Sequence, residues 1–376
     1  MKKNLVFISN EIAKDKGGIQ NMCFYLSEAF LAYFNLTIIC SADSEVDSIA
    51  NAKIIRSRYS STDLNKFRKD IIYLLFEYYK DERIDFVLTA QYCISSCCYL
   101  LKKIHGVPYG ILAHGNEVYG NVGSGRWKTI FLNRFRKTII GSSDVIFANS
   151  VYTRSLVFGI CAKANIIVVH PPIGFHEERI LEISTQKEKY ELFSLARHVE
   201  RKGLQLVIQS FPLLLEKYPK LHYNIGGDGD YTPILKKLVC NLHLEDKVFF
   251  LGALSEEEKQ EYMRKCSLFV MPSFSIPNEH SVEGFGIVYI EANSYGKFVI
   301  GSKSGGVPDA IKNGVTGFLA EENNVQSVAK CIDDFFDSNF SYNPHCCMLW
   351  AKEHFVDVIV KTYYKEISRI INHYRR

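Results

Sequence analysis

The sequence predicts an α/β protein with two doubly wound, Rossmann-like domains in series, and three observations support this. The chain has 376 residues, roughly twice the length of a usual single domain. Short β-branched or aromatic runs alternate with longer helical patterns, which indicates βαβ units and parallel sheets. The alternation stops once, at His170-Pro171-Pro172-Ile173-Gly174, and then restarts. We therefore expect one domain over residues 1–170 and a second over 171–355, joined at this Pro-Gly linker.

The first domain is expected to contain six strands and three clear helices. The helical patterns cover Gly18–Tyr33, Leu64–Tyr79 and Ile94–Ile104. The apolar strand candidates are Leu5–Ser9, Leu36–Cys40, Phe86–Thr89, Gly110–Ala113, Val145–Ala148 and Ile166–Val169.

The second domain repeats this alternation, and the tail from about Ala351 to Arg376 is expected to be helical. Its strand candidates are Glu191–Ala196, Tyr223–Gly226, Val248–Leu251, Leu268–Met271, Phe298–Ile300 and Gly317–Leu319. In such folds ligands bind outside the carboxyl ends of the strands, so we expect a cleft there, between the two domains.

Composition narrows the class of protein. The eleven cysteines lack metal-ligand spacing, which favours reduced thiols and no metal site. The amino-terminal apolar run of about five residues is too short for a signal peptide, and no run approaches the roughly 20 apolar residues of a membrane span. We therefore expect a cytoplasmic protein. Residues 1–170 carry a net charge of +7 and the remainder −3, which suggests an anionic partner for the first domain.

The segment Ser281–Glu291 follows the strand Leu268–Met271 and carries two glutamates around a Gly-Phe-Gly turn. Glycines let the backbone approach a ligand, and the next helix begins with free N–H groups. A carboxylate can accept two hydrogen bonds, which suits the vicinal diol of a ribose or a sugar. Surface glutamates beside a capped helix are the alternative for Glu283 and Glu291.

Two loops follow neighbouring strands of the second domain. Arg197 and Lys202 leave the strand Glu191–Ala196, where their charges could neutralise a diphosphate and stabilise it as a leaving group. A solvated charged loop is the alternative. Ser304–Asp309 follows Phe298–Ile300 and resembles a strand-to-helix anion loop, without the Lys and Ser/Thr of a nucleotide-triphosphatase loop.

In the first domain, Gly17 and Gly18 lie between a strand and its helix. This loop is shorter than GxGxxG and has no acidic partner, which argues against a nicotinamide dinucleotide site. His114 follows the strand Gly110–Ala113; a lone histidine is often structural, but its place at a strand's carboxyl end favours a site residue. Because His114-Gly115-Asn116-Glu117 lacks a second histidine, a metal site is disfavoured.

The segment Gly125–Lys137 has five basic residues and no acidic ones, with Trp127, Phe131, Leu132 and Phe135 on one helical stripe. Such a helix can lie on an anionic bilayer surface; a core-packed helix with a solvated basic face is the alternative. No stacking or groove-reading motif accompanies it, so nucleic-acid binding is not expected.

These motifs, in this order, resemble glycosyltransferase family 4, a retaining family with the two-domain GT-B fold. The resemblance covers nearly the whole chain and is strongest from Arg197 to Leu319. Its most specific parts are RxxxxKG at Arg197–Gly203, Glu283-x7-Glu291, SGGVPDAI at Ser304–Ile311 and NGVTGFL at Asn313–Leu319. One departure is the longer FSIPNEHSV segment after Pro272-Ser273, which is similar to enzymes acting on lipid-linked acceptors.

The resemblance implies roles for particular residues. Gly17 and Gly18 would approach the donor phosphates, His114 would lie near the transferred sugar, and Arg197 with Lys202 would bind the diphosphate. Glu283 would hold donor-sugar hydroxyls and Glu291 the ribose. Backbone donors would come from Gly284, Phe285, Gly286 and Ile287, and the nucleobase would lie at Phe250-Leu251-Gly252. A C-terminal helix over 356–376 would return to the first domain.

The implied activity is transfer of a hexose-type sugar from a UDP- or GDP-linked donor to a hydroxyl of a glycan or lipid-linked oligosaccharide, in bacterial lipopolysaccharide, O-antigen or capsule synthesis. No cofactor or metal is expected, because the cations Arg197 and Lys202 would take the metal's place. The alternatives are a GT-B sugar-nucleotide epimerase and a catalytically silent nucleotide- or glycan-binding protein.

Overall fold

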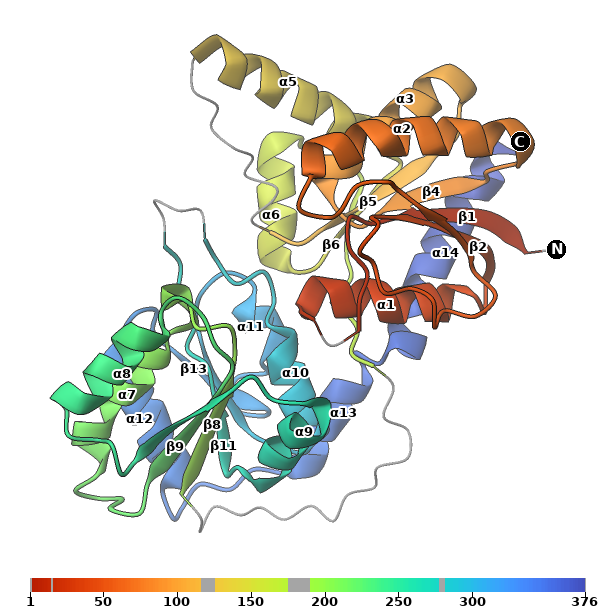
Figure 1. Ribbon diagram of the computed structural model, residues 1–376. Helices are drawn as coiled ribbons and strands as arrows, with labels where there is room; N and C mark the ends of the chain where they lie inside the picture. Colours follow the sequence, from red (N-terminus) through yellow and green to blue (C-terminus); the bar gives the residue numbers. More distant parts are fainter. Residues whose placement is uncertain (1, 15, 116–125, 175–189, 277–280, 376) are drawn as a thin grey trace. The chain divides into compact units, whose positions relative to one another are not determined.

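A computed structural model of the chain describes residues 2–14, 16–115, 126–174, 190–276 and 281–375, with side chains of the helix beginning at 126 described from residue 132 (Figure 1). It divides into two compact units. Unit 1 comprises Met1–Phe175 together with Phe355–Arg376, and unit 2 comprises His176–His354.

Unit 1 is built on a seven-stranded sheet in the order β3-β2-β1-β4-β5-β6-β7, with every neighbouring pair parallel. Parallel strands need crossover connections, which the helices between them provide. The strands are β1 Lys3–Ile8, β2 Phe34–Cys40, β3 Lys53–Arg56, β4 Phe86–Thr89, β5 Tyr109–Ala113, β6 Val145–Ala148 and β7 Ile166–Val168.

Helices cover both faces of the unit 1 sheet (Figure 1). Alternate strand residues point to opposite faces: Phe7 and Leu88 pack with α1 and α14, whereas Ile8 and Val87 pack with α2, α3 and α5. The helices are α1 Gly18–Phe30, α2 Leu64–Asp81, α3 Ser96–His105, α5 Arg126–Ser142, α6 Val151–Ile160 and α14 Val356–Tyr374, with a 3₁₀ turn, η1, at Tyr92–Ile94.

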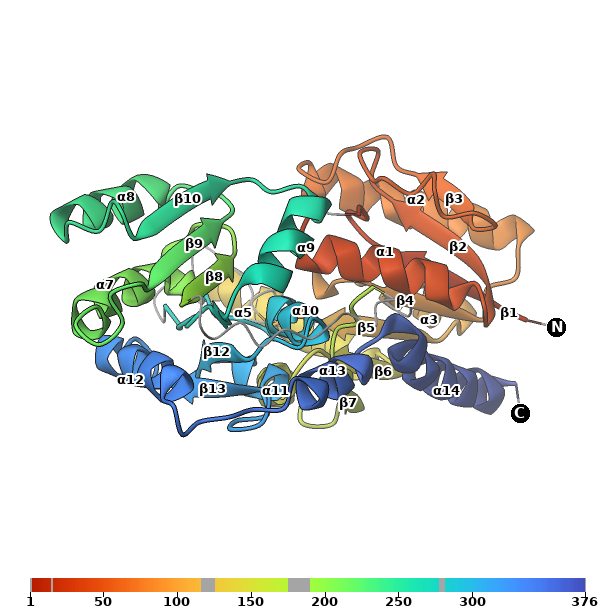
Figure 2. The same ribbon diagram turned by 90° about the horizontal axis from the view of Figure 1, so that it is seen from below.

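The last helix, α14, lies against α1 and completes the unit 1 core (Figure 2). Its buried side chains are Val360, Tyr363, Ile367, Ile370 and Ile371. The tail is not one continuous helix, because α13 ends at Lys352 and α14 begins at Val356. Phe355 between them pairs with Ile173 in an isolated parallel bridge.

Unit 2 has a six-stranded parallel sheet in the order β10-β9-β8-β11-β12-β13. The strands are β8 Glu191–Leu195, β9 His222–Gly226, β10 Val248–Gly252, β11 Leu268–Val270, β12 Val299–Ser302 and β13 Gly317–Ala320. Both sheets therefore reverse direction after their third strand, which is the doubly wound order. The predicted fold class is confirmed in each unit.

Helices cover both faces of the unit 2 sheet as well. On one face α7, α8 and α12 form the main core; on the other, Phe193 stacks on Tyr262 of α9 and Phe269 contacts Tyr289 of α10. The helices are α7 Leu204–Leu214, α8 Thr232–Asn241, α9 Glu256–Lys265, α10 Ile287–Ser294, α11 Val307–Ala310, α12 Val325–Phe336 and α13 Pro344–Lys352, with a 3₁₀ turn, η3, at Glu200–Lys202.

Candidate active site

The candidate site of unit 2 lies where the strand order reverses, between β8 and β11. These strands are paired neighbours, but their crossovers run in opposite directions, so the loops after them separate. Folds of this class bind ligands at such a reversal. The loop after β8 carries Arg197 and Lys202, and the loop after β11 carries Glu283. The predicted residues thus gather at the place where this fold class binds ligands.

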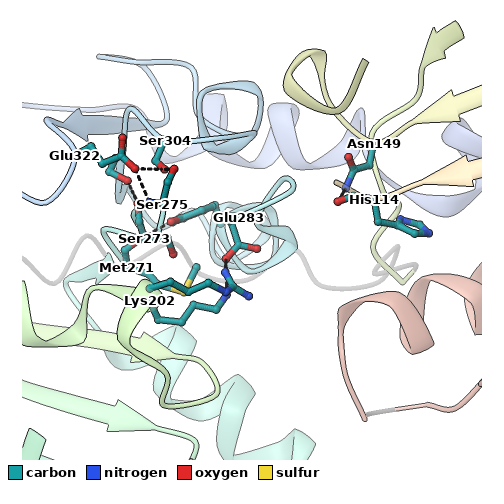
Figure 3. Close-up of polar contacts among 12 residues, drawn as sticks. His114, Asn149, Lys202, Met271, Ser273, Ser275, Glu283, Ser304 and Glu322 are labelled. Atoms are coloured by element: carbon teal, nitrogen blue, oxygen red, sulfur yellow. Dashed lines mark hydrogen bonds and ion pairs between the residues drawn. The ribbon is translucent and has the colours of Figure 1, made fainter. Parts of the chain in front are cut away.

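Glu283 accepts two charged hydrogen bonds on one oxygen, Oε2. Arg201 Nη1 donates over 2.8 Å and Lys202 Nζ over 2.6 Å (Figure 3). The three side chains are only 13–16% exposed. Burial opposes ionisation of Glu283, but Lys202 and Arg201 outweigh it and lower the pKa of the carboxyl to about 2. The carboxylate is therefore charged at any physiological pH.

Lys202 experiences the opposite balance. Burial lowers the pKa of its ammonium, Glu283 raises it, and the charges of Arg201 and Arg197 lower it further; the net direction is downward. Two cations thus contact one carboxylate, with the charge of Arg197 acting on Lys202 as well, which leaves a local excess of positive charge. Such an excess favours binding of an anion.

The turn that presents the two cations packs tightly against the loop after β11. Gly203 has φ +72°, and a Cβ there would lie 2.1 Å from the Pro272 carbonyl oxygen, so only glycine fits. The Phe274 N–H donates to the Arg201 carbonyl over 2.8 Å. Backbone contacts therefore hold the turn that carries the two cations against the start of the loop after β11.

The glycines after β12 hold the backbone of Glu283. Gly306 N–H donates to the Glu283 carbonyl over 2.9 Å, and a Cβ on Gly305, at φ +54°, would lie 2.4 Å from that oxygen. In the predicted anion loop Ser304–Asp309, the Gly306 N–H therefore already has a partner within the protein. The helix that follows it, α11, spans only Val307–Ala310.

Further contacts anchor the start of the loop after β11. Tyr289 Oη donates to the Met271 carbonyl, and the Ser275 N–H donates to Glu322. Ser304 Oγ donates to the same Glu322 oxygen over 2.7 Å (Figure 3). Burial raises the pKa of Glu322, but these hydrogen bonds outweigh it and lower the pKa overall.

The second predicted carboxylate, Glu291, lies on α10 and has a cation of its own. Lys259 of α9 donates to Glu291 Oε1 over 3.3 Å and to Glu256 over 3.2 Å. Glu291 and Glu283 are thus both paired rather than solvated surface glutamates. Neither Glu283 Oε1 nor Glu291 Oε2 accepts a hydrogen bond from the described residues.

The remaining predicted residues of unit 2 surround these pairs. Arg197 follows β8 with an exposed side chain. Gly252 ends β10 at φ +71° with open space where a Cβ would be, and its carbonyl accepts from Gly227 N–H over 2.7 Å. Gly286, at φ +93°, precedes α10. The N–H groups of Gly286 and Ile287 donate to none of the described residues. The first N–H groups of a helix have no partner within the helix and can bind a ligand.

In unit 1 the glycine loop lies beside the reversal between β1 and β4. Gly17 precedes α1 with extended backbone, and α1 begins at Gly18 with neither a capping side chain nor an acidic residue in its first turn. The start of a 13-residue helix therefore presents N–H groups and a positive dipole end.

His114 follows β5 in unit 1 and is largely buried. Its Nε2 lies 2.7 Å from the Ala90 carbonyl oxygen, and Asn149 Nδ2 donates to the His114 carbonyl over 3.1 Å (Figure 3). A carbonyl only accepts, so Nε2 carries a proton. The ring is therefore held by the carbonyl that follows β4, and the backbone of His114 by Asn149 after β6, which fits a structural or a positioning role equally.

Sequence reasoning missed Arg201 and Lys259. Arg201 lies beside Lys202, and its adjacency to a predicted site cation was the available signal. Lys259 lies in the charged run Glu256–Lys265, which is typical of a solvated helix face. Among the described residues, no three His, Cys, Asp or Glu side chains lie close enough together to hold a metal ion.

The predicted membrane-surface segment lies partly outside the described residues. Gly125 is outside them, and so are the side chains of Arg126–Phe131 in α5. Leu132 and Phe135 are each 40% exposed. Over the described ranges, every helix is too short or too polar to cross a bilayer.

The doubly wound sheets of both units, with candidate site residues at their strand ends, place the chain in a class: two-domain enzymes of the GT-B fold. The family description "Glycosyl transferases group 1" matches residues 177–345, and "Glycosyltransferase Family 4" matches residues 16–174. The two matches together span most of the sequence. The chain belongs to glycosyltransferase family 4.

Known relatives agree with this assignment. A GDP-mannose-dependent alpha-(1-6)-phosphatidylinositol monomannoside mannosyltransferase of Mycolicibacterium smegmatis is 28% identical over 232 residues, 59% of this chain and 59% of the relative.

Two solved structures share the fold. Anabaena HepE, in complex with UDP and glucose, has a TM-score of 0.75 at 16% identity and covers 97% of this chain and 100% of its own. The lipopolysaccharide outer core galactosyltransferase WaaB has a TM-score of 0.75 at 16% identity, with 98% and 99% covered.

Proposed function

We propose that this protein is a retaining glycosyltransferase that moves a hexose-type sugar from a nucleoside-diphosphate sugar to a hydroxyl group. The observation that carries the proposal is the arrangement between β8 and β11. Two cations, Arg201 and Lys202, contact the single buried carboxylate of Glu283. In both Glu283 and Glu291, one carboxylate oxygen accepts no hydrogen bond from the residues that the structure describes. Cations suit a diphosphate, and free carboxylate oxygens suit sugar and ribose hydroxyls.

In the proposed reaction the bond between the anomeric carbon and the diphosphate oxygen breaks. Arg197 and Lys202 stabilise the negative charge that develops on the departing diphosphate. The acceptor oxygen attacks the same face of the sugar, and its proton passes to the departing diphosphate. Arg201 stays with Glu283 while Lys202 turns to the diphosphate, so the sugar-binding carboxylate keeps a partner.

The positive charge of Arg197 and Lys202 takes the place of a divalent metal, so we propose that no metal or other cofactor is needed. The donor is UDP- or GDP-linked: the mannosyltransferase relative is GDP-mannose-dependent, and HepE binds UDP. Gly17, Gly18 and His114 of unit 1 would also contact the donor.

We propose a glycan or lipid-linked acceptor in bacterial surface polysaccharide synthesis, at the cytoplasmic face of the membrane. The likeness to WaaB, a lipopolysaccharide galactosyltransferase, supports this pathway. In α5, exposed Leu132 and Phe135 accompany exposed Arg134 and Lys137, a composition that suits an anionic lipid surface. Flotation with anionic liposomes at low salt tests this contact; a protein that stays with the soluble fraction contradicts it.

Two measurements test the activity. A thermal-shift screen of UDP-, GDP-, ADP- and dTDP-sugars should reveal the donor, because a ligand of the folded state raises the melting temperature. The matching donor is then incubated with acceptor glycolipids without added metal, and the anomeric configuration of the product is read by NMR. A product of inverted configuration contradicts the retaining mechanism, and stabilisation without any nucleoside diphosphate release indicates a silent binding protein.

A further inference from the structure

The ion pair between α9 and α10 joins a predicted ligand-binding carboxylate to a residue with no assigned role. Lys259 Nζ is shared between Glu291 Oε1 at 3.3 Å and Glu256 at 3.2 Å. Lys259 is 17% exposed and Glu291 21%. Burial lowers the pKa of Lys259, but the two carboxylates outweigh it and raise the pKa overall. The ammonium therefore stays charged and bound.

Lys259 itself is held from several sides. The helix that carries it begins with a capping box, in which Ser255 and Glu258 satisfy each other's backbone N–H groups. Glu256 pairs with Lys259 from the preceding turn, and Met263 of the same helix is fully buried in unit 2. A long, flexible lysine side chain is thus restrained to one place beside α10.

The consequence for Glu291 is that Lys259 occupies one oxygen, Oε1, while Oε2 accepts no hydrogen bond from the described part of the chain. Each carboxylate oxygen has two lone pairs, so Oε1 can bind Lys259 and one hydroxyl while Oε2 binds the other. A ribose diol needs both oxygens in a defined plane. Without the ammonium, Glu256 and Glu291 would be like charges near one another, and repulsion would turn Glu291 away.

We propose that Lys259 is a positioning residue that orients Glu291 for the vicinal hydroxyls of the donor's ribose. This proposal rests on the proposed function, because it requires a nucleotide at this site. It assigns Lys259 to recognition of the nucleoside part of the donor, separate from Arg201 and Lys202, which contact Glu283.

The test compares a nucleoside diphosphate with its 2′-deoxy counterpart by titration calorimetry on the full chain, using UDP with dUDP and GDP with dGDP. The wild-type protein should bind the ribose form about tenfold more tightly, the value of one charged hydrogen bond. In Lys259→Met this ratio should fall to about twofold or less, because a misplaced Glu291 no longer distinguishes the sugars. Lys259→Arg should restore it.

Lys265→Met is the matched control. Lys265 lies on the same helix, is 54% exposed and, within the described ranges, forms an ion pair only with the exposed Glu261. The ribose-to-deoxyribose affinity ratio of Lys265→Met should therefore equal the wild-type value. If Lys259→Met has a lower melting temperature than the wild type, Lys259→Gln, which keeps a polar side chain, replaces it in the titration. A Lys259→Met or Lys259→Gln protein that discriminates as the wild type does overturns the inference. Wild-type protein that binds neither UDP nor GDP overturns the proposed function and the inference with it.

Discussion

The carboxylates Glu283 and Glu291 are eight positions apart in the chain but are held in different ways. One oxygen of Glu283 accepts hydrogen bonds from two cations, both in the turn η3. A backbone hydrogen bond joins η3 to the loop after β11, which also carries Glu283. Glu291 has one cation, which it shares with a second carboxylate from another helix. The Glu283 cluster carries excess positive charge, and the Glu291 cluster carries excess negative charge.

This difference suits the two tasks that we propose for these carboxylates. A diphosphate brings negative charge, so the Glu283 cluster needs one cation more than Glu283 itself requires. Lys202 can turn to the diphosphate because Arg201 still donates a hydrogen bond to Glu283. A ribose is neutral, so the Glu291 cluster needs only a fixed acceptor. The following predictions test this contrast.

The largest effect is expected on stability, from Glu283→Gln. Two buried cations would lose their counter-charge, at a cost of about 3 kcal/mol at pH 7. The folded pKa of about 2 lies below the ordinary value of 4.5, so the carboxylate stabilises the fold fully above pH 4.5 and loses this effect as the pH falls through 2. Denaturant unfolding should therefore show a difference from wild type that shrinks in acid; a difference independent of pH contradicts the assignment.

The next effect is catalytic. Lys202→Met or Arg197→Met should each lower kcat/KM by about a hundredfold, since each removes charge that stabilises the leaving diphosphate. Lys202→Met should still fold, because Arg201 remains on Glu283. Lys217→Met, which removes an exposed cation that contacts Asp333 and the Tyr218 ring, is the control. Near-normal turnover in Arg197→Met means that the diphosphate lies elsewhere.

Arg201 should act on the sugar but not on the diphosphate. In Arg201→Met the KM for the donor should rise about tenfold, because Glu283 loses a charged hydrogen bond. Affinity for the free nucleoside diphosphate should stay within about twofold of wild type. Arg201→Lys should recover part of the loss. Equal weakening of donor and free diphosphate places Arg201 on the phosphates instead.

The smallest effect is expected from Glu256→Gln. Glu256 is 32% exposed and pairs within its own helix, and such pairs contribute about 0.5 kcal/mol. Affinity for the nucleoside diphosphate should weaken by about twofold, measured by calorimetry. If Glu256→Gln weakens the affinity for the nucleoside diphosphate as much as Lys259→Met does, then Glu256, and not Glu291, is the carboxylate that matters for binding.

The sequence predicted the strands of the main sheets well because parallel strands buried on both faces are continuous apolar runs. Phe86–Thr89 and Val145–Ala148 coincide with β4 and β6. The missed strand is β3, Lys53–Arg56, which is an edge strand with charged ends and only two apolar residues. An edge strand pairs on one side only, so little in its composition distinguishes it from a loop.

The candidate site was predictable as far as local motifs extend. Arg197, Lys202, Glu283 and Glu291 each follow from a motif at a strand's end or a helix start. The pairing of Arg201 with Glu283 joins residues 82 positions apart, and that of Lys259 with Glu291 joins residues 32 apart. Neither pairing leaves a local pattern, because the fold alone brings the partners together.

Helix α14 gives the chain an order of folding. Unit 2 is continuous in sequence, whereas the unit 1 core includes side chains from Val360 to Ile371. During synthesis, every residue of unit 2 emerges from the ribosome before the last part of the unit 1 core exists. Unit 1, although translated first, therefore cannot complete its core until α14 has been made.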